Sequence, residues 1–123
     1  MKKVLWVSNH NYSPFHIQWL ESIYGLSVSL EKYPEFIKNT ADKKQINRIK
    51  KHFNDGKFND LVIIGPPFLI ETFCREGFEP FTVESRRESN PKMIDYRDKK
   101  GQGFREIGFR KETKKSFKKN VSI

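Results

Sequence analysis

The sequence predicts an α/β fold: a small Rossmann-like domain with a mostly parallel sheet and an antiparallel C-terminal extension. Short apolar runs of strand length alternate with amphipathic helical stretches, a pattern typical of βαβ units. Gly25, Gly56 and Gly77 follow the helical stretches, where many helices end in a left-handed residue. At 123 residues the chain suits one domain. We assign residues 1–85 to a Rossmann-like core and residues 86–123 to a basic extension packed on the same domain.

The first unit is expected to run from the N-terminus to the second strand. Residues 4–7 are continuously apolar, as in a strand that is covered on both faces. Ser13 offers an N-cap and Pro14 suits the first helical position, so a helix begins there. Residues 26–30 alternate apolar side chains with serines, which predicts a half-exposed strand at the sheet edge.

The second and third units follow the same pattern. Thr40 or Asp42 caps the second helix, and residues 60–64 form a β-branched run typical of a central parallel strand. Prolines at 66–67 begin the third helix, and residues 81–84 form a fourth strand. Because βαβ crossovers are right-handed and place helices on the sheet faces, the expected strand order is 2-1-3-4.

The pattern changes after residue 85. Residues 86–91 are expected to form a turn, and residues 93–96 an antiparallel strand in a hairpin with a strand at 104–109. Residues 101–103 are expected to be the loop between them. From about Lys111 the chain is rich in lysine, and we expect it to be frayed or helical.

Charge is distributed unevenly between the two parts. Residues 1–85 hold 11 basic and 10 acidic side chains, a net +1, whereas residues 86–123 hold 13 and 5, a net +8. A basic segment of this kind favours an anionic partner.

Several protein classes are not favoured by the sequence. There is no apolar run of membrane-spanning length and no signal-peptide pattern, so a cytoplasmic protein without membrane association is expected. Cys74 is the one cysteine, and we expect it to be buried as a small apolar side chain. His16 and His52 are expected at the surface, because they show no metal-ligand spacing. Neither a P-loop nor a dinucleotide-binding glycine motif is present, and no metal or cofactor is expected.

A ligand site is expected where the strand order reverses, between the first and third strands. The loops that meet there lead into helix N-termini, which attract anions such as phosphate. The expected ligand-binding residues of these loops are Ser8, Asn9, Asn11, Tyr12, Ser13, Gly65, Pro66 and Pro67. His10 is the candidate general acid or base. Serine and asparagine also favour turns for conformational reasons alone, and this alternative stays open.

The basic segment is the second candidate site. Its cations can neutralise phosphates while interleaved aromatic rings stack on bases. The expected contact residues are Arg86, Arg87, Arg97, Lys99, Lys100, Arg105, Arg110 and Lys111, with Tyr96, Phe104 and Phe109. The alternative is a solvated charged surface around core phenylalanines.

Residues 4–10, followed by Ser13, Pro14 and Gln18, together with residues 64–67, resemble a known group of proteins. They are similar to the small Rossmann-like proteins of type III CRISPR systems, the CARF-like sensors and ring nucleases that bind or cleave cyclic oligoadenylate. The resemblance covers about the first 85 residues. It implies a symmetric homodimer whose loops hold a ring of phosphates, and it leaves a sensor, a ring nuclease and a mere fold relative as alternatives.

Three functions are therefore weighed. The leading hypothesis is nucleotide or cyclic oligonucleotide binding in antiviral signalling, with metal-independent phosphodiesterase activity. In it, His10 is the acid or base, Ser8 and Asn9 bind phosphate, and Arg86 or Arg87 stabilises developing charge. The second is a nonenzymatic accessory protein that binds DNA or RNA through its basic C-terminal segment. The third is a partner-binding protein that uses exposed phenylalanines.

Overall fold

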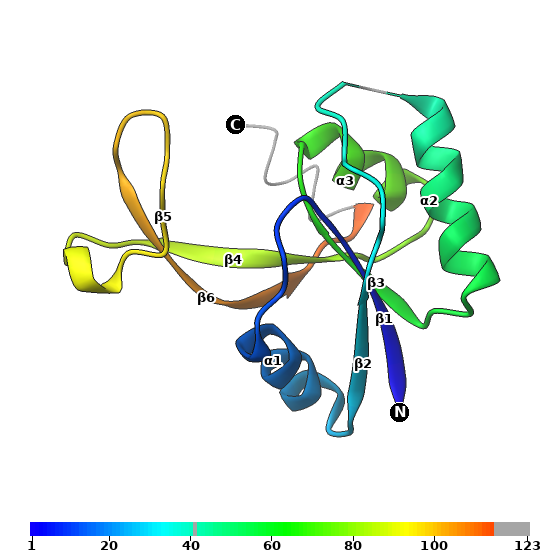
Figure 1. Cartoon of the computed structure of the whole chain (residues 1–123), viewed down its shortest axis with the longest axis horizontal. Coiled ribbons are helices and arrows are strands. Elements are labelled where there is room, and N and C mark those ends of the chain that lie inside the picture. The colour runs from blue at the N-terminus through cyan, green and yellow to red at the C-terminus, as the bar shows by residue number, and fades with distance from the viewer. Residues whose placement is uncertain (41, 115–123) are drawn as a thin grey trace.

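The computed structural model describes residues 1–40 and 42–114 and has an α/β fold (Figure 1). Its elements are β1 (Lys2–Ser8), α1 (Pro14–Tyr24), β2 (Val28–Lys32), α2 (Lys43–Asp55), β3 (Asp60–Ile64), α3 (Pro67–Arg75), β4 (Phe81–Arg87), the 3-10 turn η1 (Pro91–Met93), β5 (Tyr96–Arg97) and β6 (Gly103–Lys111). The alternation of strands and helices predicted for the first 85 residues is confirmed. Of the helices within the described ranges, none is long and apolar enough to cross a membrane.

In the described part of the chain, six strands form one mixed sheet in the order β2-β1-β3-β4-β6-β5. The pairs β1–β2, β1–β3 and β3–β4 are parallel, and β4–β6 and β5–β6 are antiparallel. This order differs from the predicted 2-1-3-4 because the sheet continues past β4 into two further strands. The link between β3 and β4 is short, with the single register pair Val62 and Phe81.

Two apolar clusters lie on the two faces of this sheet. On one face, Val4 and Trp6 of β1 pack with Leu20 of α1. On the other, Leu5 and Val7 pack with residues of α2 and α3, and Figure 1 shows α1 on one side and these two helices on the other. Because successive side chains of a strand point to opposite faces, burial of both faces explains the unbroken apolar run of β1.

The helix starts follow the sequence signals. Ser13 is the N-cap of α1, with Pro14 in the first turn. Of the two predicted caps for α2, Asp42 is the one used, since its Oδ1 accepts the backbone N–H groups of Lys44 and Gln45 at 3.0 and 3.3 Å.

The surface positions predicted for the histidines are wrong. His16 is only 7% exposed, because its ring packs against those of Trp6 and Phe109. Its Nδ1 accepts the N–H of Ser13 at 2.9 Å and completes a capping box. His52 is half-buried and its ring stacks on Phe58. Cys74 is buried, as predicted, and burial is the main cause that raises the pKa of its thiol.

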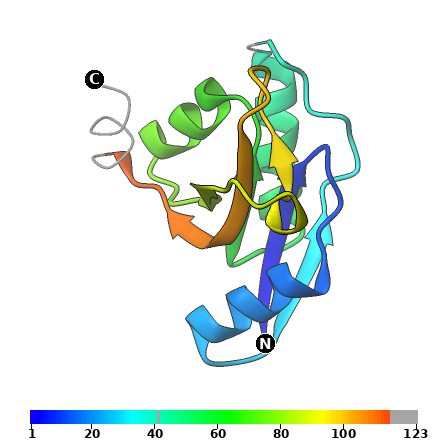
Figure 2. The same ribbon diagram turned by 90° about the vertical axis from the view of Figure 1, so that its left-hand side faces the viewer.

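The C-terminal strands extend beyond the rest of the molecule as a twisted ribbon (Figures 1 and 2). β4 continues through Arg87, so residues 86 and 87 lie in a strand and not in the predicted turn. The strand predicted at 93–96 is replaced by η1 and the short β5, although the predicted antiparallel pairing with β6 is confirmed. We refer to residues 84–108 as the arm and to residues 1–83 with 109–114 as the body.

β4 runs through the boundary placed after residue 85, so core and extension share one strand. Lys111 is the last residue of β6. Most of the lysine-rich end for which we expected a frayed or helical conformation, residues 115–123, lies outside the described residues.

Candidate functional site: a groove between α1 and the arm

The two loops predicted to bind a ligand do lie at one edge of the sheet. Ser8 and Ile64 are register partners at the ends of parallel β1 and β3, so the loops that follow leave the sheet side by side. Ile37 occupies the space between them. It is 4% exposed, and its Cγ2 lies 3.9 Å from the position that a Cβ on Gly65 would take.

The polar side chains of the loop after β1 form hydrogen bonds within the protein that fix the conformation of this loop. Asn9 accepts the N–H of Ile37 at 2.5 Å and donates to its carbonyl at 3.0 Å. Ser8 is buried, and its Oγ accepts the N–H of His10 at 3.1 Å. Asn11 accepts a hydrogen bond from the Lys32 ammonium at 2.8 Å. These bonds support the conformational role that the sequence left open for the serine and asparagine side chains.

The remaining residues of this edge offer little to an anion. Pro66 and Pro67 lack N–H groups, which removes two of the donors that the start of α3 would otherwise present. Tyr12 is half-buried with its ring edge against Trp6. The His10 ring is exposed and has no hydrogen-bond partner among the described residues, so no neighbouring group orients it as an acid or base.

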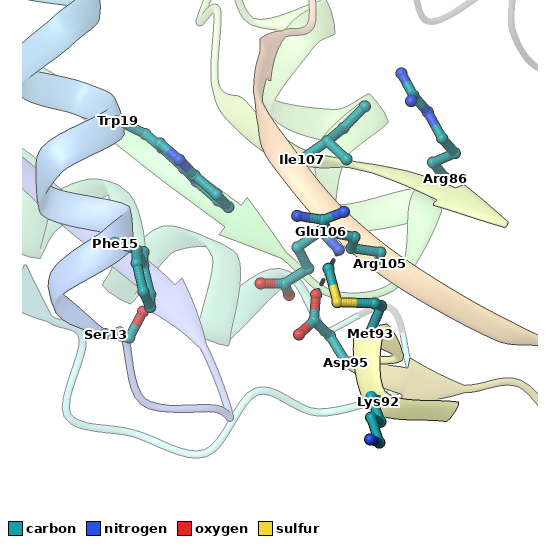
Figure 3. A pocket seen from close by; sticks show the side chains of 10 residues that line it. All are labelled: Ser13, Phe15, Trp19, Arg86, Lys92, Met93, Asp95, Arg105, Glu106 and Ile107. Carbon is teal, nitrogen blue, oxygen red and sulfur yellow. Dashed lines mark hydrogen bonds between the residues drawn. The ribbon is translucent and has the colours of Figure 1, made fainter. Parts of the chain in front are cut away.

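A groove of about 740 Å³ lies instead between α1 and the arm (Figure 3). Its lining residues come from four segments: the N-cap Ser13 with Phe15 and Trp19 of α1, Arg86 from β4, Lys92, Met93 and Asp95 from the connection between β4 and β5, and Arg105, Glu106 and Ile107 from β6. Three of the predicted site residues, Ser13, Arg86 and Arg105, are thereby brought together.

One wall of the groove is aromatic. Phe15 and Trp19 are four residues apart on α1 and therefore share one helix face. Phe15 is 66% exposed. Trp19 is half-buried and fixed edge-to-face by Phe109 and His16, at ring-centre distances of 5.7 and 5.4 Å. Its indole N–H has no hydrogen-bond acceptor within the described chain, so the groove offers a rigid ring with a free donor.

The opposite wall is cationic. Arg86 and Arg105 are register partners on β4 and β6, so their side chains stand on the same face of the ribbon. Neither forms an ion pair within residues 1–40 and 42–114. Like charges directly opposite each other on neighbouring strands destabilise a sheet. This pair therefore costs stability that an anion bound at this wall would offset.

Two carboxylates lie between these walls, and both have partners. His16 Nδ1 accepts the N–H of Ser13, so Nε2 carries the proton and donates to Glu106 Oε2 at 3.3 Å. Asp95 Oδ2 accepts the backbone N–H of Glu106 at 2.8 Å. Each carboxylate thus has one oxygen fixed and one outside these bonds.

A second hollow of about 640 Å³ lies at the tip of the arm. It is lined by Arg87, Asp98, Lys99, Lys100, Gly101 and Gln102. Asp98 accepts the backbone N–H groups of Lys100 and Gln102, both at 2.9 Å, and so shapes the turn. Arg87 and Arg86 are adjacent in β4 and point to opposite faces of the ribbon. The arm therefore presents cations on both of its faces.

The cations of the arm lack the ion pairs that those of the body have. Of the 11 Lys and Arg residues in 1–85, six form ion pairs: Lys3, Lys38, Arg48, Lys50, Lys51 and Arg75. Residues 86–105, all of them described, hold seven such residues and no ion pair. Arg97 donates to the Gly101 carbonyl at 2.8 Å. The predicted contact residues Arg110 and Lys111 are engaged with Glu112 and Asp60.

An aromatic stack lies beside these cations. The rings of Tyr96 and Phe104 are 5.2 Å apart and nearly parallel, at 13°, and Tyr96 is 44% exposed. Its hydroxyl donates to Ser85 Oγ at 3.0 Å. One ring face of Tyr96 is therefore supported from behind by Phe104.

Comparison with family models, with curated proteins and with solved structures found no match to this chain. The resemblance to CARF-like proteins, the homodimer that it implies and the cyclic oligonucleotide ligand stay predictions. No group of three side chains suited to a metal ion occurs within residues 1–40 and 42–114.

Apart from Ser13, Arg86 and Arg105, the sequence analysis missed the residues that line the groove, including Phe15 and Trp19 of α1 and Glu106 of β6. Phe15 and Trp19 lie off the apolar stripe of α1, in which Leu20 is buried. Two aromatic side chains four residues apart on the other face of an amphipathic helix were the signal that could have identified them.

Proposed function

We propose that the protein binds nucleic acid through the arm, with phosphates held by its cations and without a chemical step on the bound strand. The observation that carries this proposal is the difference in ion pairing between the arm and the body. Seven cations within residues 86–105 make no ion pair in the described chain, and their repulsion is offset when phosphates take the place of counterions.

The acidic side chains of the same segment support this reading. Glu88 and Asp98 each accept a backbone N–H within a turn, and Asp95 accepts one from Glu106 of β6, so these carboxylates hold the backbone of the arm and form no ion pair with its cations within the described residues.

The extended shape of the charged surface favours a polymer over a small nucleotide. Three cations line the groove and three line the hollow at the arm tip, on a ribbon that extends away from the body (Figure 1). A chain of phosphates can contact both places at once, whereas a mononucleotide can fill only one.

The experiment is a binding titration with a fluorescent single strand of about 12 nucleotides, within the roughly 4–16 that comparable sites cover. The tip variant Arg87→Gln/Lys99→Gln/Lys100→Gln removes three unpaired cations from the arm. The matched body variant Lys43→Gln/Lys44→Gln/Lys57→Gln removes three exposed cations that form no ion pair among the described residues.

We expect the tip variant to lose about fivefold in affinity for each phosphate contact removed at about 0.1 M salt, and the body variant to bind like the unmodified protein. Equal losses in the two variants, or no binding by the unmodified protein, would overturn the proposal. Competition with cyclic oligoadenylate in the same assay shows whether that ligand and the strand share one site, because only then should it displace the strand.

A further inference from the structure

We infer that the groove between α1 and the arm holds one unstacked nucleotide of the bound strand, and that the protein therefore binds single-stranded nucleic acid. This inference rests on the proposed function and adds the class of strand and the contacts of one nucleotide. The volume of the groove, about 740 Å³, falls within the roughly 300–1,000 Å³ of small-molecule sites. Figure 3 shows aromatic side chains on one side of the groove and charged side chains on the other.

The aromatic wall suits a base. A side chain as exposed as Phe15, at 66%, contributes little to the core, yet it lies one helical turn from Trp19 on the same wall. Trp19 is held edge-to-face by Phe109 and His16, so its ring is already fixed before a ligand arrives. A base that stacks on these rings covers apolar surface that folding leaves open.

The cationic wall suits the phosphate of the same nucleotide. Arg86 and Arg105 stand directly opposite each other with no carboxylate paired to either in the described chain. A phosphate at this wall can accept hydrogen bonds from an arginine, because a guanidinium group is well shaped for bidentate contacts. Lys92 adds a third positive charge to the lining.

The two carboxylates suit the polar edge of a base. Glu106 Oε1 and Asp95 Oδ1 lie outside the hydrogen bonds that fix their partner oxygens. They are acceptors for the exocyclic amino groups of adenine, guanine or cytosine, and their negative charge disfavours phosphate at that end. The groove therefore has an orientation, with phosphate at the arginines and the base at the rings and carboxylates.

A base inside a duplex cannot enter this groove, since it is paired and stacked on both sides. A single strand has unstacked bases that side chains can bind. The groove thus predicts a preference for single strands that the cations of the arm alone would not produce.

The test compares the affinity of the full chain for the labelled single strand and for a hairpin duplex of matched length. Phe15→Ala removes the most exposed ring of the groove, and Phe36→Ala is the matched control, because Phe36 is 74% exposed and does not line the groove. Phe15→Tyr keeps an aromatic ring and serves as the rescue variant.

We expect Phe15→Ala to lower single-strand affinity by about 5- to 150-fold, the range for loss of one stacked base, and to leave duplex affinity unchanged. Phe36→Ala should change neither, and Phe15→Tyr should keep most of the single-strand affinity. Arg86→Gln/Arg105→Gln should lose the same preference while the fold is retained.

Trp19 provides a second readout. Binding of the single strand should quench its fluorescence, and binding of the duplex should not. Unchanged single-strand affinity in Phe15→Ala, or equal losses for strand and duplex, would overturn the inference. If the tip variant still weakens binding in that case, the proposed function stands and only the nucleotide subsite fails; if the tip variant binds normally, the proposed function itself fails.

Discussion

The body and the arm share one sheet but differ in burial and in the pairing of their charges. In β1 of the body, residues 4–7 are all buried, and more than half of the cations of residues 1–85 are in ion pairs. In the arm, which is described throughout, Gly103 is the one buried residue, and cations stand unpaired on both faces. The body is therefore shaped by burial of apolar area, whereas the sequence of the arm is dominated by what it presents to its surroundings.

Local contacts hold the arm together in place of a core. β4 and β6 form a long antiparallel ladder, Tyr96 stacks on Phe104, and the Glu88 N–H donates to the Gly103 carbonyl at 3.0 Å. Such contacts are individually small. The arm should consequently open at lower free energy than the body unfolds.

The largest difference should appear when one phenylalanine is truncated in each region. Phe73 lies on α3 and is fully buried in the apolar cluster that α2 and α3 form with the sheet, so Phe73→Ala should cost about 3–5 kcal/mol of unfolding free energy. Phe104 is half-buried and stacks on a single ring, so Phe104→Ala should cost about 1 kcal/mol. Urea denaturation of both variants measures this, and similar costs would contradict the distinction between the two regions.

Gly103→Ala should disturb the arm alone. A Cβ at this position would lie 2.4 Å from Ile94 Cδ1 and 2.8 Å from the Glu88 carbonyl oxygen, so the connection between β4 and β5 must move at a cost of about 1–3 kcal/mol. We expect faster amide hydrogen exchange in residues 84–108 and unchanged exchange in β1 and β3. Gly101→Ala is no substitute control, because Gly101 has a positive φ of 82°; Lys99→Ala, at an exposed turn position, serves that purpose and should leave exchange in the arm unchanged.

The salt dependence of nucleic-acid binding should also distinguish the cations of the two regions, by a smaller effect. For the unmodified protein, the logarithm of the binding constant should fall linearly with the logarithm of salt concentration. The tip variant should reduce the magnitude of this slope by about 2, at roughly 0.7 per lost contact with a single strand, and the body variant by about 0. A slope that is the same in all three proteins would show that the arm cations do not contact phosphates.

The smallest effect concerns alkaline pH and belongs to the body. Burial, and then the hydrogen bond to Glu35, raise the pKa of Tyr33 from 10.0 to about 12. A raised pKa favours the protonated phenol in the folded state, so this contribution to stability is complete below about pH 10 and is lost as the pH rises toward 12. Tyr33→Phe should flatten the decline in urea midpoint over that interval, and an unchanged decline would remove Tyr33 as its cause.

The parts of the fold that the sequence predicted are those built by burial. The apolar run at 4–7, the β-branched run at 60–64 and the cap at Asp42 have direct structural causes, and each was found. Arg86 and Arg87 were misplaced in a turn because a strand exposed on both faces has no apolar alternation to reveal it. His16 was misplaced because a capping box with histidine in the position usual for glutamate looks like a polar surface residue.

The site was only partly predictable for a different reason. Which cations lack partners depends on where every carboxylate lies, and that is a property of the folded chain. The groove joins α1 to β6, and this contact follows from the antiparallel return of β6 along β4. The loops at the ends of β1 and β3 were located correctly. The segment between β2 and α2, which places Ile37 between these loops, has no periodic pattern from which its position could be predicted.

The measurement that tests the central claim most directly is a map of backbone amide chemical shifts in ¹⁵N-labelled protein while the single strand is added. We predict that the shifts concentrate in residues 84–108 and in residues 13–19 of the groove wall. Shifts confined to residues 8–12 and 65–67, with the arm unchanged, would contradict the account and return the ligand to the carboxyl ends of β1 and β3.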